Sequence, residues 1–132
     1  NDFMVFARIE SFILNKNLAD AMNRAKKYVK AGVDGIMIHS KSKDPKEIFK
    51  FAKAFRKFNT KIPLVSVPST YNHVTEKNLV DNGFNIVIYA NQLLRASYYS
   101  MSKVAKEILA NSRAKESENN LISIKEIVNL IP

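Results

Sequence analysis

The sequence has no cysteine and only three glycines in 132 residues. Without cysteine it can form neither a disulfide nor a thiolate metal site, which fits an intracellular protein, and we expect a cytoplasmic one. Three glycines are too few for a glycine-rich phosphate loop, and no GxGxxG, P-loop, nucleophile-elbow or HExxH motif occurs. No apolar run approaches the roughly 20 residues of a membrane span, so we expect no membrane partner. The chain starts without Met and enters an apolar run directly, from which we expect a piece of a longer protein.

The formal net charge is +9, from 21 Lys and Arg against 12 Asp and Glu. Such a surplus is found in proteins that bind nucleic acid, anionic membranes or small anionic substrates. The lysines are spread along helical segments rather than gathered in one block, which is typical of solvated helix faces. A stand-alone module that binds anions or nucleic acid remains an alternative. The aromatic residues of 49–58 fall mostly on a buried helix face, where they cannot stack on bases, so we expect no nucleic-acid partner.

Four short apolar runs are continuous rather than alternating, which is typical of parallel strands buried on both faces. Segments with helical periodicity lie between them, and the order is therefore strand–helix repeated four times. Asp44 is expected to cap the second helix with Pro45 as its first residue, and Thr75 to cap the third. The predicted strands are 3–7, 35–38, 63–67 and 85–89, and the predicted helices are 18–30, 47–58, 75–81 and 92–109.

The remaining residues predict a polar linker or mobile loop over 111–120, followed by a short terminal helix over 123–130. Ser123 and Glu126 have the spacing of a capping box. Four strand–helix units form either half of a (β/α)8 barrel, which needs about 250 residues, or a small open sheet. Periodicity does not separate these two α/β folds.

Polar side chains follow each predicted strand, at the carboxyl ends where ligands bind in either fold. Arg8 offers a planar fork that holds a carboxylate or phosphate, although with Glu10 it could equally form a structural ion pair. His39 could donate a hydrogen bond to a phosphoryl oxygen or act as an acid or base, or be an ordinary strand-end histidine. Ser40 and Lys41 could add phosphate contacts. Too few carboxylates lie near the strand ends to hold Mg²⁺, so we expect no metal site in this chain.

Several segments resemble the phosphoenolpyruvate mutase family, within the superfamily that also contains isocitrate lyase. The most specific are ARIE at 7–10 and IMIHSK at 36–41, at this separation. Residues 67–71 (VPSTY), 83–91 (GFNIVIYAN), 94–96 (LRA) and 122–127 (ISIKEI) resemble later family segments in the same order. The loop 14–17 departs from the family because it lacks the glycines usual there.

The resemblance implies the C-terminal half of a (β/α)8 barrel, strands five to eight, whose last helix is exchanged between subunits. Residues 1–110 would then form the half barrel, 111–120 the linker and 121–132 the C-terminal helix, in a homo-oligomer. The family interconverts phosphoenolpyruvate and phosphonopyruvate with Mg²⁺, whose ligands would lie in the missing half. Arg8 matches the arginine that binds the phosphoryl end of the substrate, and His39 the histidine beside it. Glu10, Ser40 and Asn91 match positions that line or support the pocket.

The leading hypothesis is therefore an intramolecular phosphotransferase that forms a carbon–phosphorus bond, in phosphonate biosynthesis. This chain alone is expected to be inactive. A phosphonopyruvate hydrolase is the closest alternative, because it shares the residues present here and differs in a loop of the missing half. An isocitrate lyase type of enzyme is disfavoured by HSK at 39–41.

Overall fold

The computed structural model describes residues 3–130 and divides them into two compact units, with the boundary between Ala90 and Asn91. The first unit contains four strands and three helices, and the second contains two α-helices and a 3₁₀ helix. Residues 1, 2, 131 and 132, which the predicted ranges 1–110 and 121–132 include, lie outside the described residues. The domain division drawn from the sequence stays a prediction.

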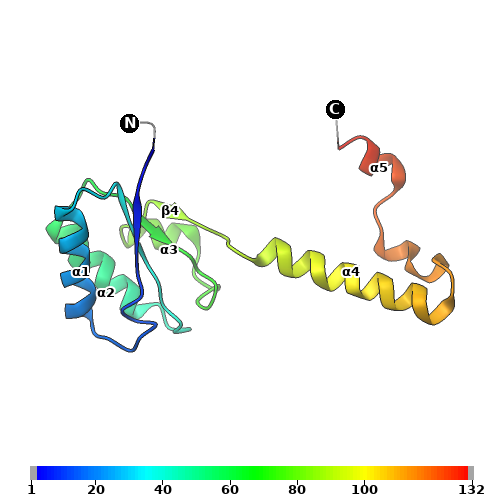
Figure 1. Ribbon diagram of the computed structural model, residues 1–132, viewed down its shortest axis with the longest axis horizontal. Helices are drawn as coiled ribbons and strands as arrows, with labels where there is room; N and C mark the ends of the chain where they lie inside the picture. Colours follow the sequence, from blue (N-terminus) through cyan, green and yellow to red (C-terminus); the bar gives the residue numbers. More distant parts are fainter. Residues whose placement is uncertain (1–2, 131–132) are drawn as a thin grey trace. The chain divides into compact units, whose positions relative to one another are not determined.

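The four strands form one parallel sheet in the order β1-β2-β3-β4 (Figure 1). The predicted alternation of parallel strands with helices is confirmed. Among residues 3–130, β1 and β4 each pair with one strand, so one edge of each has no strand beside it. The strands are β1 (Phe6–Ile9), β2 (Gly35–Ile38), β3 (Leu64–Ser66) and β4 (Ile86–Val87).

The first strand lies later in the chain than the predicted range 3–7. The exchange between Val5 and Asp34 explains the difference, because the Val5 N–H donates to Asp34 Oδ2 at 2.7 Å and the Val5 carbonyl accepts from the Asp34 N–H at 2.8 Å. At Val5, a hydrogen bond to the Asp34 side chain replaces one of the backbone hydrogen bonds between the strands. Regular strand pairing begins at Phe6↔Gly35. The strand then runs on to Ile9, two residues beyond the predicted end.

The helices of the first unit are α1 (Leu18–Lys30), α2 (Lys46–Phe58) and α3 (Glu76–Asp81). The predicted bounds of α1 are confirmed, and Thr75 caps α3 as predicted, because its side chain accepts from the Asn78 N–H. The predicted start of α2 is wrong by one residue: Pro45 is the capping residue. Asp44 still accepts the Lys46 N–H at 3.0 Å, which also lowers the pKa of its carboxyl.

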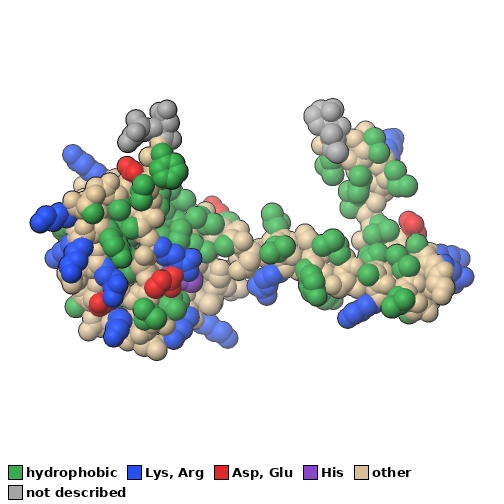
Figure 2. Space-filling view, viewed as in Figure 1, with side chains coloured by type: hydrophobic (Ala, Val, Ile, Leu, Met, Phe, Trp, Pro, Cys, Tyr) green, Lys and Arg blue, Asp and Glu red, His purple; other side chains and the backbone are tan. Residues whose placement is uncertain are grey.

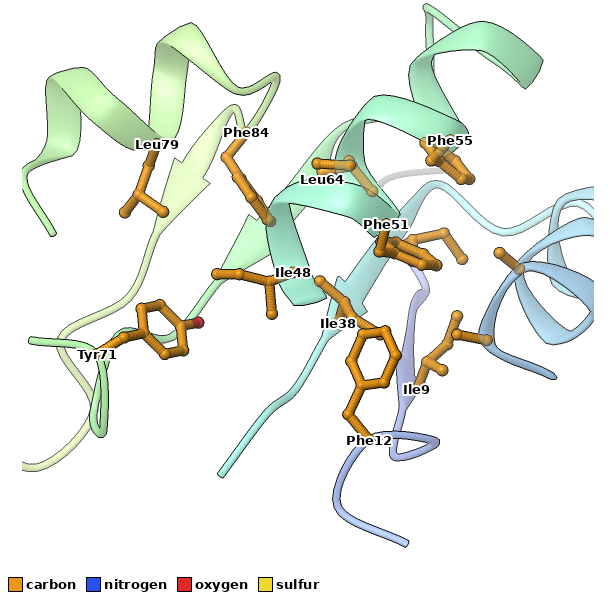
Figure 3. Packing of buried hydrophobic residues seen from close by; sticks show 14 residues of the cluster. Ile9, Phe12, Ile38, Ile48, Phe51, Phe55, Leu64, Tyr71, Leu79 and Phe84 are labelled. Carbon is orange, nitrogen blue, oxygen red and sulfur yellow. The ribbon is translucent and has the colours of Figure 1, made fainter. Parts of the chain in front are cut away.

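The core lies between the helices and the sheet face that they cover (Figure 3). Phe51 of α2 contacts the Phe12 ring edge-on at 6.5 Å and stacks on Phe55 at 5.9 Å. Tyr71 is fully buried, its hydroxyl lies 3.1 Å from Ser66 Oγ, and burial raises its pKa. The strand residues that point into this core are Ile9, Ile36, Ile38 and Leu64.

The second unit consists of α4 (Gln92–Asn111), η1 (Lys115–Asn120) and α5 (Ile124–Val128). The prediction of a loop over 111–120 is wrong in part, because η1 packs on α4. Lys103 of α4 donates to Asn120 Oδ1 at 2.9 Å, and this long-range contact fixes a stretch that looks polar and featureless in sequence. The capping box of Ser123 and Glu126 is confirmed at the start of α5.

Candidate active site at the rim of the sheet

The register of strands β1 and β2 brings the side chains of the site together. They end side by side at Ile9↔Ile38, and the His39 N–H donates to the Ile9 carbonyl at 3.1 Å. Ile9 and Ile38 point into the core. Successive side chains of a strand point to opposite faces, so Arg8, Glu10 and His39 project from the other face, at the carboxyl rim.

Three of the predicted site residues meet there. Arg8 Nη2 lies 2.6 Å from His39 Nδ1, and Arg8 Nε forms an ion pair with Glu10 Oε1. A guanidinium can only donate hydrogen bonds, so His39 Nδ1 is the acceptor. The His39 imidazole in this contact is therefore neutral, with its proton on Nε2. Glu10 Oε2 lies 3.4 Å from the same Nδ1.

The rim is open to solvent, and the charged side chains on it are paired. The Arg8 side chain is 52% exposed and that of Glu10 37%, so a small ligand can reach both. Partial burial opposes ionisation of Glu10, but the hydrogen bond and positive charge of Arg8 favour the carboxylate, and the pKa of the carboxyl is lowered. Glu10 and His39 use two of the five guanidinium donors, and the others remain for an anion.

The other predicted residues take different places. Ser40 is buried and bonds Glu47 on the helix side of the sheet. Lys41 donates to the Ile13 carbonyl at 3.1 Å and so ties the loops after β1 and β2 together. Asn91 opens the second unit, and its buried Oδ1 has no hydrogen-bond partner among the described residues. No position relative to Arg8 follows for it, and its role in the pocket stays a prediction.

Glu47 and Thr70 also contact this part of the structure, although neither was among the predicted site residues. Both bond to the loop after β2, Glu47 from the first turn of α2 and Thr70 from the loop after β3. An acidic residue in a first helical turn is ordinary in sequence, so nothing marks Glu47. The VPSTY segment was the one signal for Thr70.

Residues 3–130 contain no cluster of three or more His, Asp or Glu side chains suited to a metal ion. None of the helices in that range has the length and apolar character needed to cross a bilayer. On the face of the first unit that Figure 2 shows, the lysines and arginines are scattered rather than gathered in one block.

Comparison with known proteins gives consistent matches. The family model described as phosphoenolpyruvate phosphomutase matches residues 1–109. Phosphonopyruvate hydrolase of Variovorax sp. (strain Pal2) is 37% identical over 130 residues, which is 98% of this chain and 44% of the relative. Phosphoenolpyruvate phosphomutase of Tetrahymena pyriformis is 35% identical over 129 residues, 98% of this chain and 42% of the relative.

Solved structures match equally well. The phosphoenolpyruvate phosphomutase from Streptomyces platensis subsp. rosaceus superimposes with a TM-score of 0.88 at 33% identity, over 98% of this chain and 44% of that one. A phosphonopyruvate hydrolase in complex with oxalate and Mg²⁺ gives 0.85 at 37% identity, over 98% and 45%. The prediction of a partial (β/α)8 barrel is thereby confirmed. The chain spans less than half the length of these relatives, and it belongs to the phosphoenolpyruvate phosphomutase family.

Proposed function

We propose that this chain supplies the phosphoryl-binding rim of an enzyme that interconverts phosphoenolpyruvate and phosphonopyruvate. The observation that carries the proposal is the 2.6 Å contact between Arg8 Nη2 and His39 Nδ1 at the carboxyl ends of neighbouring strands. Phosphoryl transfer depends on positioning and on neutralising charge. Arg8 would hold the phosphoryl oxygens with its remaining donors, and His39 would donate from Nε2 to orient the group.

In the mutase reaction the bond from phosphorus to the enol oxygen breaks, and a bond from phosphorus to carbon forms in the same molecule. No atom enters or leaves. Glu10 would not take part in bond making; its carboxylate holds the guanidinium in place. Arg8, Glu10 and His39 would thus hold the phosphoryl group in place while it moves from oxygen to carbon. This suits a reaction in which the enzyme supplies little covalent chemistry.

A phosphonopyruvate hydrolase is the second candidate, because a relative of that name is 37% identical to this chain, against 35% for a mutase. A hydrolase would use the same rim but deliver the phosphoryl group to water, with phosphate and pyruvate as products. The residues described here suit both reactions, since both bind the same phosphorus-bearing anion.

Mg²⁺ is proposed for the whole enzyme, supported by the hydrolase structure that contains it. The residues of this chain do not fit the ion by themselves, because no three carboxylates or imidazoles cluster among residues 3–130. Glu10 is also occupied by Arg8. The ligands would therefore come from the rest of the barrel, and the rim residues act on the phosphoryl end of the substrate.

The chain is proposed to be inactive alone and to need the remaining strands of the barrel. The unpaired edges of β1 and β4 support this, because exposed strand edges seek a partner. A homo-oligomer with an exchanged C-terminal helix is proposed as well. It is supported by large exposed apolar side chains on α4 and α5, among them Leu93, Leu94, Ile124 and Val128.

The test is turnover of phosphonopyruvate followed by ³¹P NMR. It compares this chain alone with the same chain mixed with the complementary half of the Variovorax hydrolase and with a full-length protein that contains it. A mutase yields phosphoenolpyruvate, and a hydrolase yields inorganic phosphate. Formation of neither product by the full-length protein, with Mg²⁺ present, would contradict the proposal.

A further inference from the structure

The loop after β2 is held by a buried hydroxyl that uses both its hydrogen-bonding roles. Ser40 is 2% exposed. Its Oγ donates to Glu47 Oε1 on α2 and accepts the Ser42 N–H at 2.9 Å. The hydroxyl has one proton to give, so Glu47 fixes the direction of that proton and leaves a lone pair for Ser42.

A second anchor reaches the same loop from the loop after β3. Thr70 Oγ1 lies 3.0 Å from the Ser42 carbonyl and 3.3 Å from the Ser40 carbonyl, and its single proton is shared between them. The loop is therefore tied on one side to α2 and on the other to the loop after β3. Its backbone around Ser40 has little freedom to rotate.

The anchored backbone at Ser40 also restrains His39, because His39 is the residue immediately before it. The Ser40 side chain points to the helix side, towards Glu47, and the His39 side chain points to the rim, towards Arg8. We propose that Glu47 is a positioning residue for His39: it acts through Ser40 and touches no substrate. The inference rests on the proposed function, since it assigns a role within the same site.

The alternative is that Glu47 only complements the dipole of α2, as an acid in the first turn does. The chain offers a matched control for that role. Glu76 stands in the first turn of α3, and its carboxylate accepts from the Tyr89 hydroxyl at 2.9 Å. Glu76→Ala removes the same charge from the same kind of position. The hydrogen bond that it removes, however, is to Tyr89 and not to Ser40.

The experiment uses the full-length protein that contains this chain and compares Glu47→Ala, Glu47→Gln and Glu76→Ala. Glu47→Ala is expected to lower kcat and kcat/KM together by about 100-fold, the cost of misplacing a group that acts in the transition state. Glu47→Gln keeps an acceptor oxygen and is expected to retain most of the activity. Glu76→Ala is expected to stay within about threefold of wild type.

A second readout is independent of activity. The ring nitrogens of His39, followed by ¹H–¹⁵N NMR, report the neutral form protonated on Nε2 that the Arg8 contact requires. Glu47→Ala, and Ser40→Ala as a second variant, are expected to shift these signals, whereas Glu76→Ala leaves them in place. Unchanged His39 signals in both variants would overturn the inference, and so would wild-type kcat in folded Glu47→Ala. Failure of the wild-type protein to turn over substrate would count against the proposed function alone, because the NMR result stands without it.

Discussion

The ring of Phe6 lies where a side chain on Gly35 would have to be. The two residues are opposite each other in the register of β1 and β2, and a Cβ added at residue 35 would collide with the ring. The close approach of a neighbouring side chain, rather than an unusual backbone conformation, therefore requires glycine here. It also packs an aromatic ring on the sheet face from which Arg8 projects.

Gly35→Ala is expected to destabilise the protein by about 1–3 kcal/mol, since overpacking moves the ring or the strand. Urea unfolding measures the change. If the ring is responsible, the additional change Phe6→Leu recovers part of the loss. A double variant no more stable than Gly35→Ala would show that another contact is the cause.

Arg8→Lys is expected to lower turnover by about 100-fold or more, because an ammonium cannot bind Glu10, His39 and a phosphoryl oxygen in one plane. The ³¹P NMR assay on the full-length protein measures it. Arg24→Lys is the matched control, since Arg24 pairs with Asp20 at 2.8 Å within α1. Equal activity of the two variants would mean that Arg8 has no special role.

The Glu10 carboxyl makes stability depend on pH. Its pKa is lowered in the folded chain, so the unfolded chain binds a proton first as the pH falls. The contribution is complete above the ordinary glutamate pKa and is lost as the pH falls through the lowered value. Urea midpoints of wild type and Glu10→Gln are therefore expected to differ at neutral pH and to converge in acid. A gap that stays constant down to the acid limit would contradict this prediction.

Arg56 stabilises the fold rather than the site. Its Nε donates to the Gly83 carbonyl and its Nη1 to the Ile62 carbonyl, both at 2.8 Å, so it joins the end of α2 to the turns before β3 and β4. Arg56→Met is expected to cost about 2–3 kcal/mol, because these carbonyls lose a charged donor. Denaturant unfolding measures the cost. Lys57→Met, at the exposed neighbouring position, is expected to change stability by less than about 0.5 kcal/mol.

Local signals predicted the elements that local chemistry controls. The bounds of α1 and the cap at Thr75 follow from periodicity and polar side chains close by in sequence. The start of β1 could not be predicted, because the Asp34 side chain that binds the Val5 N–H is 29 residues away. The same holds for η1, which depends on a contact from Lys103.

Some residues of the site could likewise be predicted from the sequence, and others could not. Parallel strands carry their carboxyl ends to one edge, so the meeting of Arg8 with His39 could be anticipated once the strands were recognised. Glu47 could not, because its contact with Ser40 depends on how the first turn of α2 packs against the loop. Such support comes from tertiary packing, which leaves no motif in the sequence.

One imidazole nitrogen stands between a cation and an anion. It can accept from Arg8 or, once it carries a proton, donate to Glu10, but not both at the same time. Of the two neutral tautomers, only the one that accepts from Arg8 at Nδ1 carries its proton on Nε2, where it can donate to an anion. Arg8, on the neighbouring strand, thus decides whether His39 offers a ligand a donor or an acceptor.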